Sequence, residues 1–148
     1  MRKVLGINDG RKPRVPAFFC IKSLDIMKLV WFLLDTGSIF SILNESEALL
    51  MGIEPTTLPY AKVESIGFGG TFKHRMINRS VELIFKTSEN DFYKIPQSGF
   101  RVCSPEDKDP EKRKRMVELT PCVVGMDVLS KFEIHIYKKK IELISFEP

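Results

Sequence analysis

A strand-like segment that ends in a single carboxylate has the clearest capacity for chemistry in this sequence. The apolar run 30–34 leads directly into Asp35, which is followed by a tight turn of Thr36, Gly37 and Ser38. Aspartate is depleted in strands and costly to bury without hydrogen bonds or a second polar group, so the turn must supply such interactions. The pattern therefore predicts a buried carboxylate that is held ready for acid–base chemistry.

Composition and length place the chain among single globular domains. Its 148 residues are 43% hydrophobic, which is enough to build a core. We expect residues 1–12 to be an N-terminal extension and residues 13–148 to form one domain. The N-terminus lacks the apolar core of a signal peptide, and the longest apolar run, 29–34, is too short to cross a bilayer. We therefore expect a cytoplasmic protein without a membrane partner.

The cysteines and histidines do not form a pattern that is typical of a cofactor site. Cys20, Cys103 and Cys122 are widely spaced and lack a Cys-x-x-Cys pair. Neither His74 nor His135 stands at metal-ligand spacing from another histidine or cysteine. We therefore expect reduced thiols, no metal and no other cofactor.

The net charge of +4 is concentrated in two short basic runs, at residues 112–115 and 138–140. Basic runs of this size are usually solvated loops, so we do not expect nucleic acid as a partner. A nucleic-acid-associated protein that uses the run at 112–115 remains a rival hypothesis, and its binding would depend strongly on salt.

The remaining segments are organised as short β-strands with few helices. Residues 15–21 and 28–34 flank a polar turn and predict a hairpin that delivers Asp35. Asn44 as N-cap, Glu47 reaching back to it and Gly52 at the end predict a short helix. Further strands are expected at 61–66, 73–86, 92–95, 99–103, 117–124, 132–137 and 141–146, and a second short helix at 127–131.

Two loops differ from the rest of the chain in composition. The glycine-rich segment 67–70 separates two predicted strands, so we expect it to form the tip of a second hairpin. Residues 105–115 are strongly charged, contain two prolines and lack apolar periodicity. We expect them to form an exposed insertion loop at about 104–116.

Three of these features, in a fixed order, resemble the retropepsins, which are aspartic proteases that work as homodimers. They are Leu-Leu-Asp-Thr-Gly-Ser at 33–38, the glycine-tipped hairpin at 65–72, and Val-Val-Gly-Met-Asp-Val-Leu at 123–129. The segment 125–144 runs from a glycine through a helix into a terminal hairpin, and it looks like the end of the protease domain in cellular DNA-damage-inducible-type retropepsins. The resemblance covers about residues 13–146.

The resemblance implies an all-β acid-protease fold, a closed β-barrel with two short helices. It also implies a homodimer whose active site lies on the twofold axis. The residue chemistry supports this mechanism independently, because peptide hydrolysis without a metal or nucleophile requires a base to activate water and an acid to protonate the amide. Two carboxyls that share one proton serve both roles. The chain has one Asp-Thr-Gly, so the second Asp35 must come from a second copy.

The resemblance assigns supporting roles to the three residues that follow Asp35. It implies that Thr36 hydrogen-bonds across the axis, that Gly37 leaves room for the substrate backbone and that Ser38 donates to the carboxylate. A hydroxyl donor stabilises an ionised carboxylate. We therefore expect an activity optimum more acidic than in relatives that carry alanine at this position.

The glycine-rich tip matches the flap of the family. The matching residues are Gly67, Phe68, Gly69 and Gly70. The resemblance implies that their backbone closes over the bound peptide and excludes water. An ordinary β-turn is the alternative interpretation.

Three further residues match positions that line the substrate-binding cleft in the family. Leu33, Val123 and Gly125 imply a preference for bulky apolar side chains at the cleaved bond. Leu33 and Val123 are equally consistent with ordinary core positions.

The sequence departs from the viral members of the family at two charged positions. Many viral members carry an aspartate two residues after the Asp-Thr-Gly glycine and an arginine directly after the later glycine. This chain has Ile39 and Met126 there. If the two charges pair, their joint loss avoids a lone buried charge, so we expect the loss to be compensated rather than disabling. The loss also argues against a viral type of subsite specificity.

An intact Asp-Thr-Gly shows a capacity for catalysis rather than turnover. The sequence therefore leaves two main hypotheses open. The first is an active homodimeric aspartic endopeptidase that acts on peptides or proteins. The second is a non-catalytic module with the retropepsin fold that binds peptides or dimerises without cutting.

Overall fold

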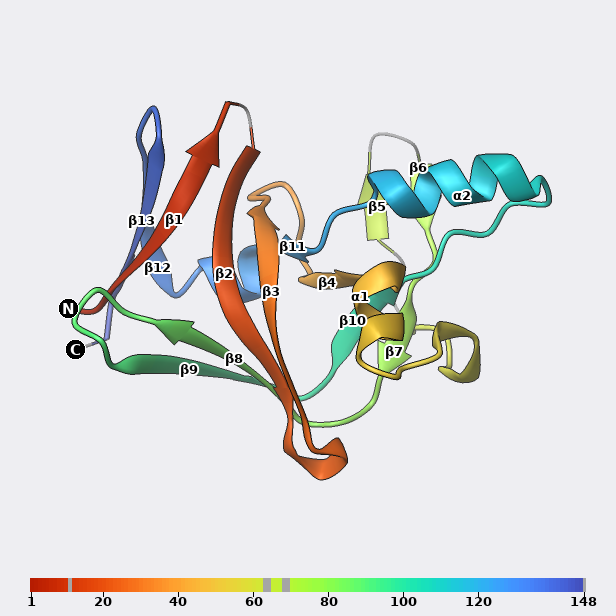
Figure 1. Cartoon of the computed structure of the whole chain (residues 1–148), viewed down its shortest axis with the longest axis horizontal. Coiled ribbons are helices and arrows are strands. Elements are labelled where there is room, and N and C mark those ends of the chain that lie inside the picture. The colour runs from red at the N-terminus through yellow and green to blue at the C-terminus, as the bar shows by residue number, and fades with distance from the viewer. Residues whose placement is uncertain (11, 63–64, 68–69, 148) are drawn as a thin grey trace.

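The computed structural model of the chain describes residues 1–10, 12–62, 65–67 and 70–147. Most of their backbone is β-strand, as the sequence predicts, with short helices between the strands (Figure 1). In chain order the elements are β1 (Lys3–Asp9), β2 (Lys12–Ile21), the 3-10 helix η1 (Lys22–Leu24), β3 (Ile26–Leu34), β4 (Ile42–Asn44), α1 (Glu45–Leu50), the 3-10 helix η2 (Pro55–Thr57), β5 (Ser65–Gly67), β6 (Gly70–Phe72), β7 (Arg75–Ile77), β8 (Val81–Lys86), β9 (Phe92–Gln97), β10 (Phe100–Cys103), α2 (Pro110–Leu119), β11 (Val123–Val124), α3 (Met126–Leu129), β12 (Phe132–Ile136) and β13 (Lys140–Ser145).

One large sheet joins most of the described strands, in the order β12-β13-β1-β2-β3-β11-β4-β10-β7. The path ends at β12 and β7, so the described sheet is not closed, and the predicted closed barrel is wrong. The physical reason lies in β2, which pairs with β1 near its start and with β8 at residues 18–20. The arm β8–β9 therefore branches from β2 instead of closing the sheet.

The hairpin β2–β3 is the central element of the sheet and confirms the sequence prediction. In Figure 1 it separates the terminal strands β1, β12 and β13 from β7, β10, α1 and α2. The two strands pair in register from Arg14 opposite Leu33 to Ile21 opposite Ile26. Pro16 falls between the parts of β2 that pair with β1 and β8, where the strand has a partner on one side only. A strand tolerates a proline at such a place because no ladder hydrogen bond is lost there.

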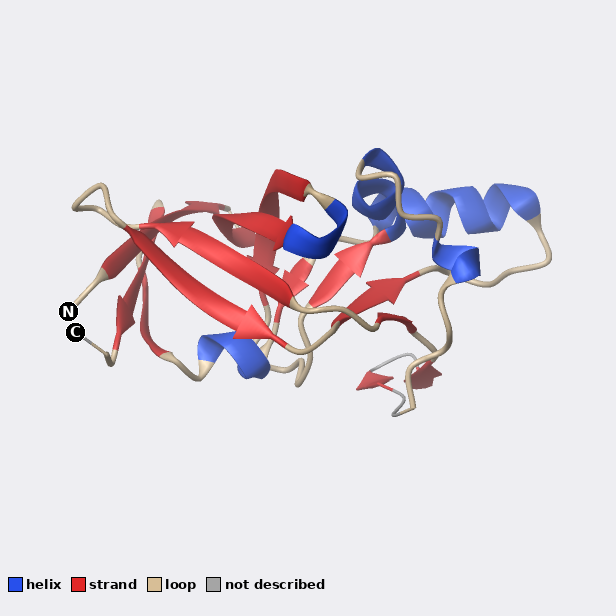
Figure 2. Ribbon diagram, turned by 90° about the horizontal axis from the view of Figure 1, so that it is seen from below, coloured by secondary structure: helices blue, strands red, loops and turns tan. Residues whose placement is uncertain are grey.

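The first residues of the chain belong to the sheet. The segment that we expected to be an N-terminal extension, 1–12, contains β1, which pairs with β13 on one side and β2 on the other. Ser145 N donates to the carbonyl of Arg2 at 2.8 Å, so the two ends of the chain lie together, as Figure 2 shows. This part of the fold depends on a pairing between residues about 140 positions apart, which no local pattern indicates.

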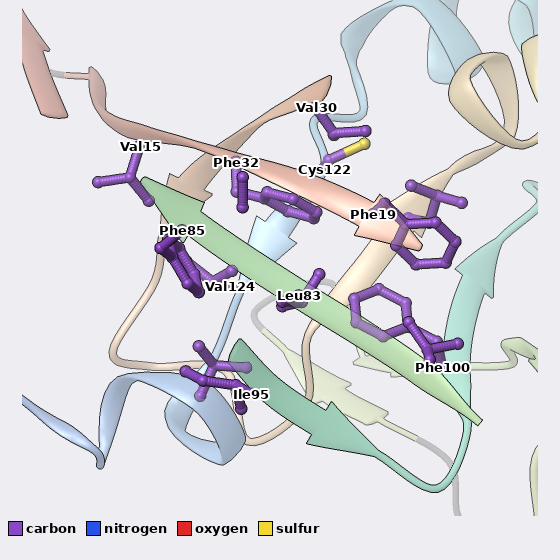
Figure 3. Close-up of a cluster of buried hydrophobic side chains, with 14 of the residues drawn as sticks. Val15, Phe19, Val30, Phe32, Leu83, Phe85, Ile95, Phe100, Cys122 and Val124 are labelled. Carbon is purple, nitrogen blue, oxygen red and sulfur yellow. The ribbon is translucent and has the colours of Figure 1, made fainter. Parts of the chain in front are cut away.

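The core lies between the inner face of β2–β3 and the arm β8–β9 (Figure 3). Alternate residues of the hairpin are fully buried, which is the period-2 pattern of a strand with one covered face. Phe19 and Phe100 pack edge to face with their ring centroids 5.0 Å apart, and Phe85 packs on Phe132 in the same way at 5.7 Å. The first contact holds β10 against the hairpin that carries the Asp35 turn, and the second holds β12 against β8.

Helix α1 confirms the predicted N-cap and end. Asn44 Oδ1 accepts a hydrogen bond from Glu47 N at 2.8 Å, and Gly52 has a positive φ of 80°. We expected the Glu47 side chain to reach back to the cap, but it does not. It pairs instead with Lys28 Nζ of β3 at 2.5 Å, which ties the helix to the hairpin.

The charged segment 105–115 is the main error in the secondary-structure prediction. Most of it belongs to α2 rather than to an exposed loop, so the described chain has three α-helices instead of two. Asp109 caps the helix by accepting from Glu111 N, and Pro110 occupies its first position. The helix buries none of its residues, which explains why its sequence shows no apolar period. None of the helices in the described ranges is long and apolar enough to span a membrane.

Other boundaries differ from the predictions in smaller ways. The expected long strand at 73–86 is divided into β7 and β8 by an interruption at 78–80. The expected strand at 117–124 is reduced to Val123 and Val124, because residues 117–119 complete α2. The predicted strands at 92–95, 99–103, 132–137 and 141–146 are confirmed as β9, β10, β12 and β13 with shifts of a few residues.

The close packing of β1 gives a test of its place in the fold. A Cβ on Gly6 would contact the carbonyl oxygen of Arg14 and would lie 2.5 Å from Val15 Cγ1, so Gly6→Ala forces β1 away from β2. We expect this substitution to lower the free energy of unfolding by about 2 kcal/mol or more, measured by urea denaturation. Leu5→Ala on the exposed face of the same strand is the control and should cost less than about 1 kcal/mol. Equal small effects of both would show that β1 is peripheral.

Candidate active site

Asp35 lies directly after β3, in a turn whose backbone is fixed from two directions. Asp35 N donates to the carbonyl of Val124 at 3.1 Å, which joins the end of β3 to β11. Within the turn, Gly37 N donates to Asp35 Oδ1 at 2.9 Å, and Ser38 N donates to the Asp35 carbonyl at 3.1 Å. One carboxylate oxygen is therefore oriented by the turn itself.

The carboxylate is exposed in the single chain. Asp35, Thr36 and Gly37 are all exposed, so the prediction of a buried carboxylate is wrong for one copy of the protein. The reason is that β3 ends at Leu34 and the turn projects beyond the sheet. A Cβ on Gly37 would lie 3.2 Å from Asp35 Oδ1, so glycine leaves the carboxylate room to receive its hydrogen bond.

Ser38 does not make the hydrogen bond that we expected. Its Oγ donates to the carbonyl of Phe40 at 2.7 Å instead of to Asp35. A serine hydroxyl has one proton to donate, so in this arrangement it cannot also donate to the carboxylate. The structure therefore does not support an acidic optimum that depends on this contact.

The turn rests on the start of α3, and Gly125 makes that contact close. Met126 N donates to the Ser38 carbonyl at 2.8 Å, and Asp127 N donates to the Ile39 carbonyl at 3.0 Å. A Cβ on Gly125 would lie 2.6 Å from the Ser38 oxygen, so any larger residue would push the turn away. We predicted Gly125 as a cleft residue. In the structure it allows the Asp35 turn to lie close to the start of α3.

Two polar residues that our sequence predictions missed complete this support. Ser41 N donates to Asp127 Oδ2 at 3.0 Å, and Ser41 Oγ donates to Asp127 Oδ1 at 2.6 Å. Gly125 N in turn donates to Ser41 Oγ at 3.0 Å. The Gly-x-Asp spacing at 125–127 was the available signal, but only the tertiary structure shows which serine it binds.

Leu33 and Val123 meet across β3 and β11, which pair in parallel. β11 also pairs with β4, so it lies between the strands that enter and leave the Asp35 turn. Leu33 and Val123 are both half-buried. Leu33 also lines a cavity of about 810 Å³ together with Trp31 and Pro121. These two predicted cleft residues therefore lie in the paired strands that lead into Asp35 and Gly125.

A buried basic group lies behind the turn. The Arg101 side chain, only 6% exposed, stacks on the Phe40 ring at 3.7 Å from its centroid. Its Nη1 lies 3.4 Å from Nδ1 of His74, which is 4% exposed. A guanidinium only donates hydrogen bonds, so Nδ1 must be the unprotonated nitrogen of a neutral imidazole. Burial first, and then the charge of Arg101, lowers the pKa of His74 to about 4.

The glycine-tipped hairpin is partly described. β5 and β6 pair as a separate two-stranded sheet, with Gly67 opposite Gly70. Phe68 and Gly69, the other two residues of the predicted flap tip, lie outside the described residues. The structure thus brings two of the four predicted flap residues into one antiparallel pair.

Cys103 and Cys122 do not provide a reactive thiol at this site. Burial raises the pKa of Cys122 to about 12, and its Sγ accepts a hydrogen bond from Asn44 N at 3.3 Å. Burial also raises the pKa of Cys103. Thiols of this kind stay protonated and are poor nucleophiles. Among the described residues, no three His, Cys, Asp or Glu side chains are grouped so that they could hold a metal ion.

Comparison with solved structures supports the fold. A retropepsin-like aspartic protease from Rickettsia conorii matches over 95% of this chain and 89% of its own, with a TM-score of 0.60 and 17% sequence identity. The chain has a retropepsin-like fold. No protein-family model matches the sequence, and no curated protein sequence matches it. The similarity to DNA-damage-inducible-type members therefore stays a prediction from the sequence.

The contact between Gly125 and the Asp35 turn can be tested by adding one methyl group. Gly125→Ala places a Cβ against two backbone carbonyls, those of Ser38 and Phe40, which cannot rotate away as a side chain would. We expect a loss of about 2–3 kcal/mol in the free energy of unfolding, measured by urea denaturation. We also expect changed NMR shifts for the amides of 35–41. Ser130→Ala at the exposed other end of α3 should leave both unchanged, and unchanged 35–41 shifts in Gly125→Ala would contradict the contact.

The neutral state of His74 predicts how stability depends on pH. Its pKa is about 4 in the folded chain and 6.5 when unperturbed, so the unfolded chain binds the extra proton first as pH falls. The stability should therefore fall between about pH 6.5 and 4, by on the order of 3 kcal/mol in total. His74→Gln, neutral throughout, should remove this part of the decline in urea denaturation at a series of pH values. His135→Gln should keep it, and an unchanged decline in His74→Gln would contradict the assignment.

Proposed function

We propose that this chain is an aspartic endopeptidase that acts as a homodimer, with one Asp35 from each copy at the active site. The observation that carries the proposal is the placement of Asp35. Its backbone is fixed by β11, one of its oxygens accepts a bond from Gly37, and the carboxylate is exposed to a second molecule. The retropepsin-like fold supports this interpretation, since the match with the Rickettsia conorii protein covers nearly the whole chain.

A second carboxylate is needed for the chemistry, and Asp127 cannot supply it. Both oxygens of Asp127 accept hydrogen bonds from Ser41, so this carboxylate is used to hold the turn. A general acid and a general base that share one proton must lie close together. A second copy that presents the same exposed turn about a twofold axis would bring the two Asp35 side chains together.

The surface beside the turn is suited to such contact. Ile39 is 71% exposed and Met126 is 39% exposed, and both lie in the segments that hydrogen-bond the Asp35 turn to α3. Exposed large apolar residues next to a functional group are typical of an interaction surface. These two positions carry charges in many viral relatives, so here an apolar contact would replace an ionic one.

In the proposed mechanism, the ionised Asp35 takes a proton from a water molecule, which attacks the peptide carbonyl carbon. The protonated Asp35 of the other copy donates a hydrogen bond to the carbonyl oxygen of the substrate. The proton taken from water then passes to the leaving amide nitrogen as the C–N bond breaks, and both carboxyls return to sharing one proton.

Other residues would bind and orient the peptide. Leu33 and Val123, half-buried beside the turn, would form an apolar wall that favours bulky apolar side chains at the cleaved bond. Gly37 would admit the peptide backbone, and Thr36 would hydrogen-bond the partner's turn. The hairpin β5–β6 would lie over the peptide and exclude water.

The central test is cleavage of a mixed peptide library from about pH 3 to 8 by the wild-type chain and by Asp35→Asn. We expect cuts between bulky apolar residues that fall by about 10³-fold or more in Asp35→Asn, since the shared proton is lost. Asp25→Asn is the matched control, because Asp25 has a φ of 54° in the exposed turn after β2, a conformation that asparagine also adopts. Equal cleavage by Asp35→Asn would exclude the mechanism. Binding without cleavage by the wild-type chain would favour the peptide-binding module.

Subunit mixing tests the shared site separately. Wild-type chain mixed with an excess of Asp35→Asn should lose activity as inactive mixed dimers form, whereas an excess of Asp25→Asn should not inhibit. If an excess of Asp35→Asn leaves the activity per wild-type chain unchanged, one copy of Asp35 is sufficient for cleavage and the shared site is wrong.

A further inference from the structure

The hairpin β5–β6 leaves the body of the protein at a base where two segments of chain meet. Tyr60 and Arg75 form an isolated antiparallel β-bridge at this base. Beside it, Ala61 N donates to the carbonyl of His74 at 2.8 Å. The position of the hairpin relative to the sheet therefore depends on how firmly residues 60 and 75 are held together.

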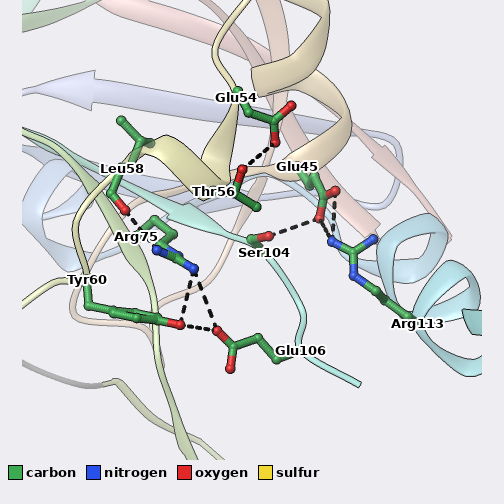
Figure 4. Close-up of polar contacts among 9 residues, drawn as sticks. All are labelled: Glu45, Glu54, Thr56, Leu58, Tyr60, Arg75, Ser104, Glu106 and Arg113. Carbon is green, nitrogen blue, oxygen red and sulfur yellow. Dashed lines mark hydrogen bonds and ion pairs between the residues drawn. The ribbon is translucent and has the colours of Figure 1, made fainter. Parts of the chain in front are cut away.

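The Arg75 side chain holds the base together through three contacts (Figure 4). Its guanidinium stacks on the Tyr60 ring, 3.9 Å from the centroid. Nη1 donates to the Leu58 carbonyl at 2.9 Å, and Nη2 donates to Tyr60 Oη at 3.1 Å. The side chain is only 19% exposed, so these contacts are partly shielded from water. A planar group with several donors is required, because a lysine cannot stack and donate in two directions at once.

Glu106 links this base to the segment that leads into α2. Tyr60 Oη donates to Glu106 Oε1, and Arg75 Nη2 lies 3.9 Å from the same oxygen. The hydrogen bond to Glu106 is the main cause that raises the pKa of Tyr60, so the phenol keeps its proton and remains a donor. The three side chains thus form one cluster, shown in Figure 4, which we call the Arg75 cluster.

The segment that carries Glu106 is itself anchored at both ends to one carboxylate. Ser104 Oγ donates to Glu45 Oε2 at 3.2 Å, and Arg113 Nη2 lies 2.9 and 2.7 Å from the two Glu45 oxygens. The Glu45 side chain is 12% exposed, and Glu45 is the first residue of α1, directly after β4. β4 pairs with β11, the strand that fixes Asp35. A continuous set of contacts therefore joins the hairpin base to the body that carries the turn.

We propose that Arg75 is a positioning residue for peptide binding, which sets the placement of β5–β6 by joining Tyr60 at the hairpin base to Glu106 of the α2 segment. This inference rests on the proposed function, in which the hairpin contacts the peptide. The described partners of the Arg75 side chain are Leu58, Tyr60 and Glu106, and none of them belongs to the Asp35 turn. Arg75 therefore acts on substrate binding rather than on proton transfer.

The first test compares kinetic constants of Arg75→Lys with those of the wild-type chain on one cleaved peptide. Losing one shielded hydrogen bond and the stacking should raise KM about fivefold while kcat changes less than about twofold. Arg79→Lys is the matched control, because Arg79 makes only an exposed contact with Ser23 Oγ at 3.3 Å among its described hydrogen bonds. A fall in kcat at constant KM, or the same change in Arg79→Lys, would overturn the proposal.

The second test does not require peptidase activity, so it separates this inference from the proposed function. Amide hydrogen exchange at residues 65–72 should be about fivefold faster in Arg75→Lys, with unchanged exchange in β2 and β3 and an unchanged midpoint of thermal unfolding. Unchanged exchange at 65–72 would overturn the proposal even if the wild-type chain cleaves peptides. Faster exchange would support the role of Arg75 in placing β5–β6 even if the comparison with Asp35→Asn shows that the wild-type chain does not cleave peptides.

A gentler pair of variants guards against a general loss of folding in Arg75→Lys. The Glu106 side chain is 62% exposed, so replacing it should not disturb the core. Glu106→Ala removes the acceptor for Tyr60 Oη and should speed exchange at 65–72, whereas Glu106→Gln keeps an acceptor oxygen and should largely restore the slower rate. Equal exchange in the two variants would contradict a role of the hydrogen bond.

Discussion

The geometry of the site depends on one close contact, that between Gly125 and the backbone of the Asp35 turn. The carbonyls of Ser38 and Phe40 approach the Cα of Gly125 so closely that no side chain fits there. This approach lets α3 donate backbone hydrogen bonds to the turn and lets Ser41 bind Asp127. Since β11 directly precedes Gly125 and also binds Asp35 N, a single short segment, residues 124–127, holds both ends of the turn that carries the carboxylate. Asp35 is therefore exposed in a turn whose backbone is held by hydrogen bonds to β11 and α3.

The polar groups around the turn divide into those that hold the fold and one that is open to a second molecule. Asp127 is satisfied by Ser41, Arg101 is shielded by Phe40 and lies against a neutral His74, and the hydroxyl of Ser38 is used by the Phe40 carbonyl. Buried polar groups are costly unless they are paired, so these partners are structural requirements. Asp35 differs because one oxygen accepts from Gly37 while the side chain remains exposed. The low pKa of His74 also means that the folded chain should be less stable at acidic pH than at neutral pH.

Local signals in the sequence were reliable where one element contains its own determinants. The alternation of β2 and β3, the Asn44 cap and the positive φ of Gly52 all appear as expected. The prediction failed for α2 because this helix buries no residue and so has no apolar period, although Asp109 and Pro110 did carry a capping signal. It failed for β1 and for the closure of the sheet because both depend on which distant strands pair. No local pattern states that β1 lies beside β13 or that β8 branches from β2.

The sequence by itself determined the carboxylate, its glycine turn and the order of the motifs, because strand period, caps and turn residues act over a few neighbouring positions. It also carried the resemblance to retropepsins, which agrees with the fold of the Rickettsia conorii protein. Only the tertiary structure decided that Ser38 binds Phe40, that Ser41 and Asp127 support the turn, and that Arg75 joins the hairpin base to Glu106. The physical reason is that a polar side chain can bind many partners, and long-range packing selects which of them it meets.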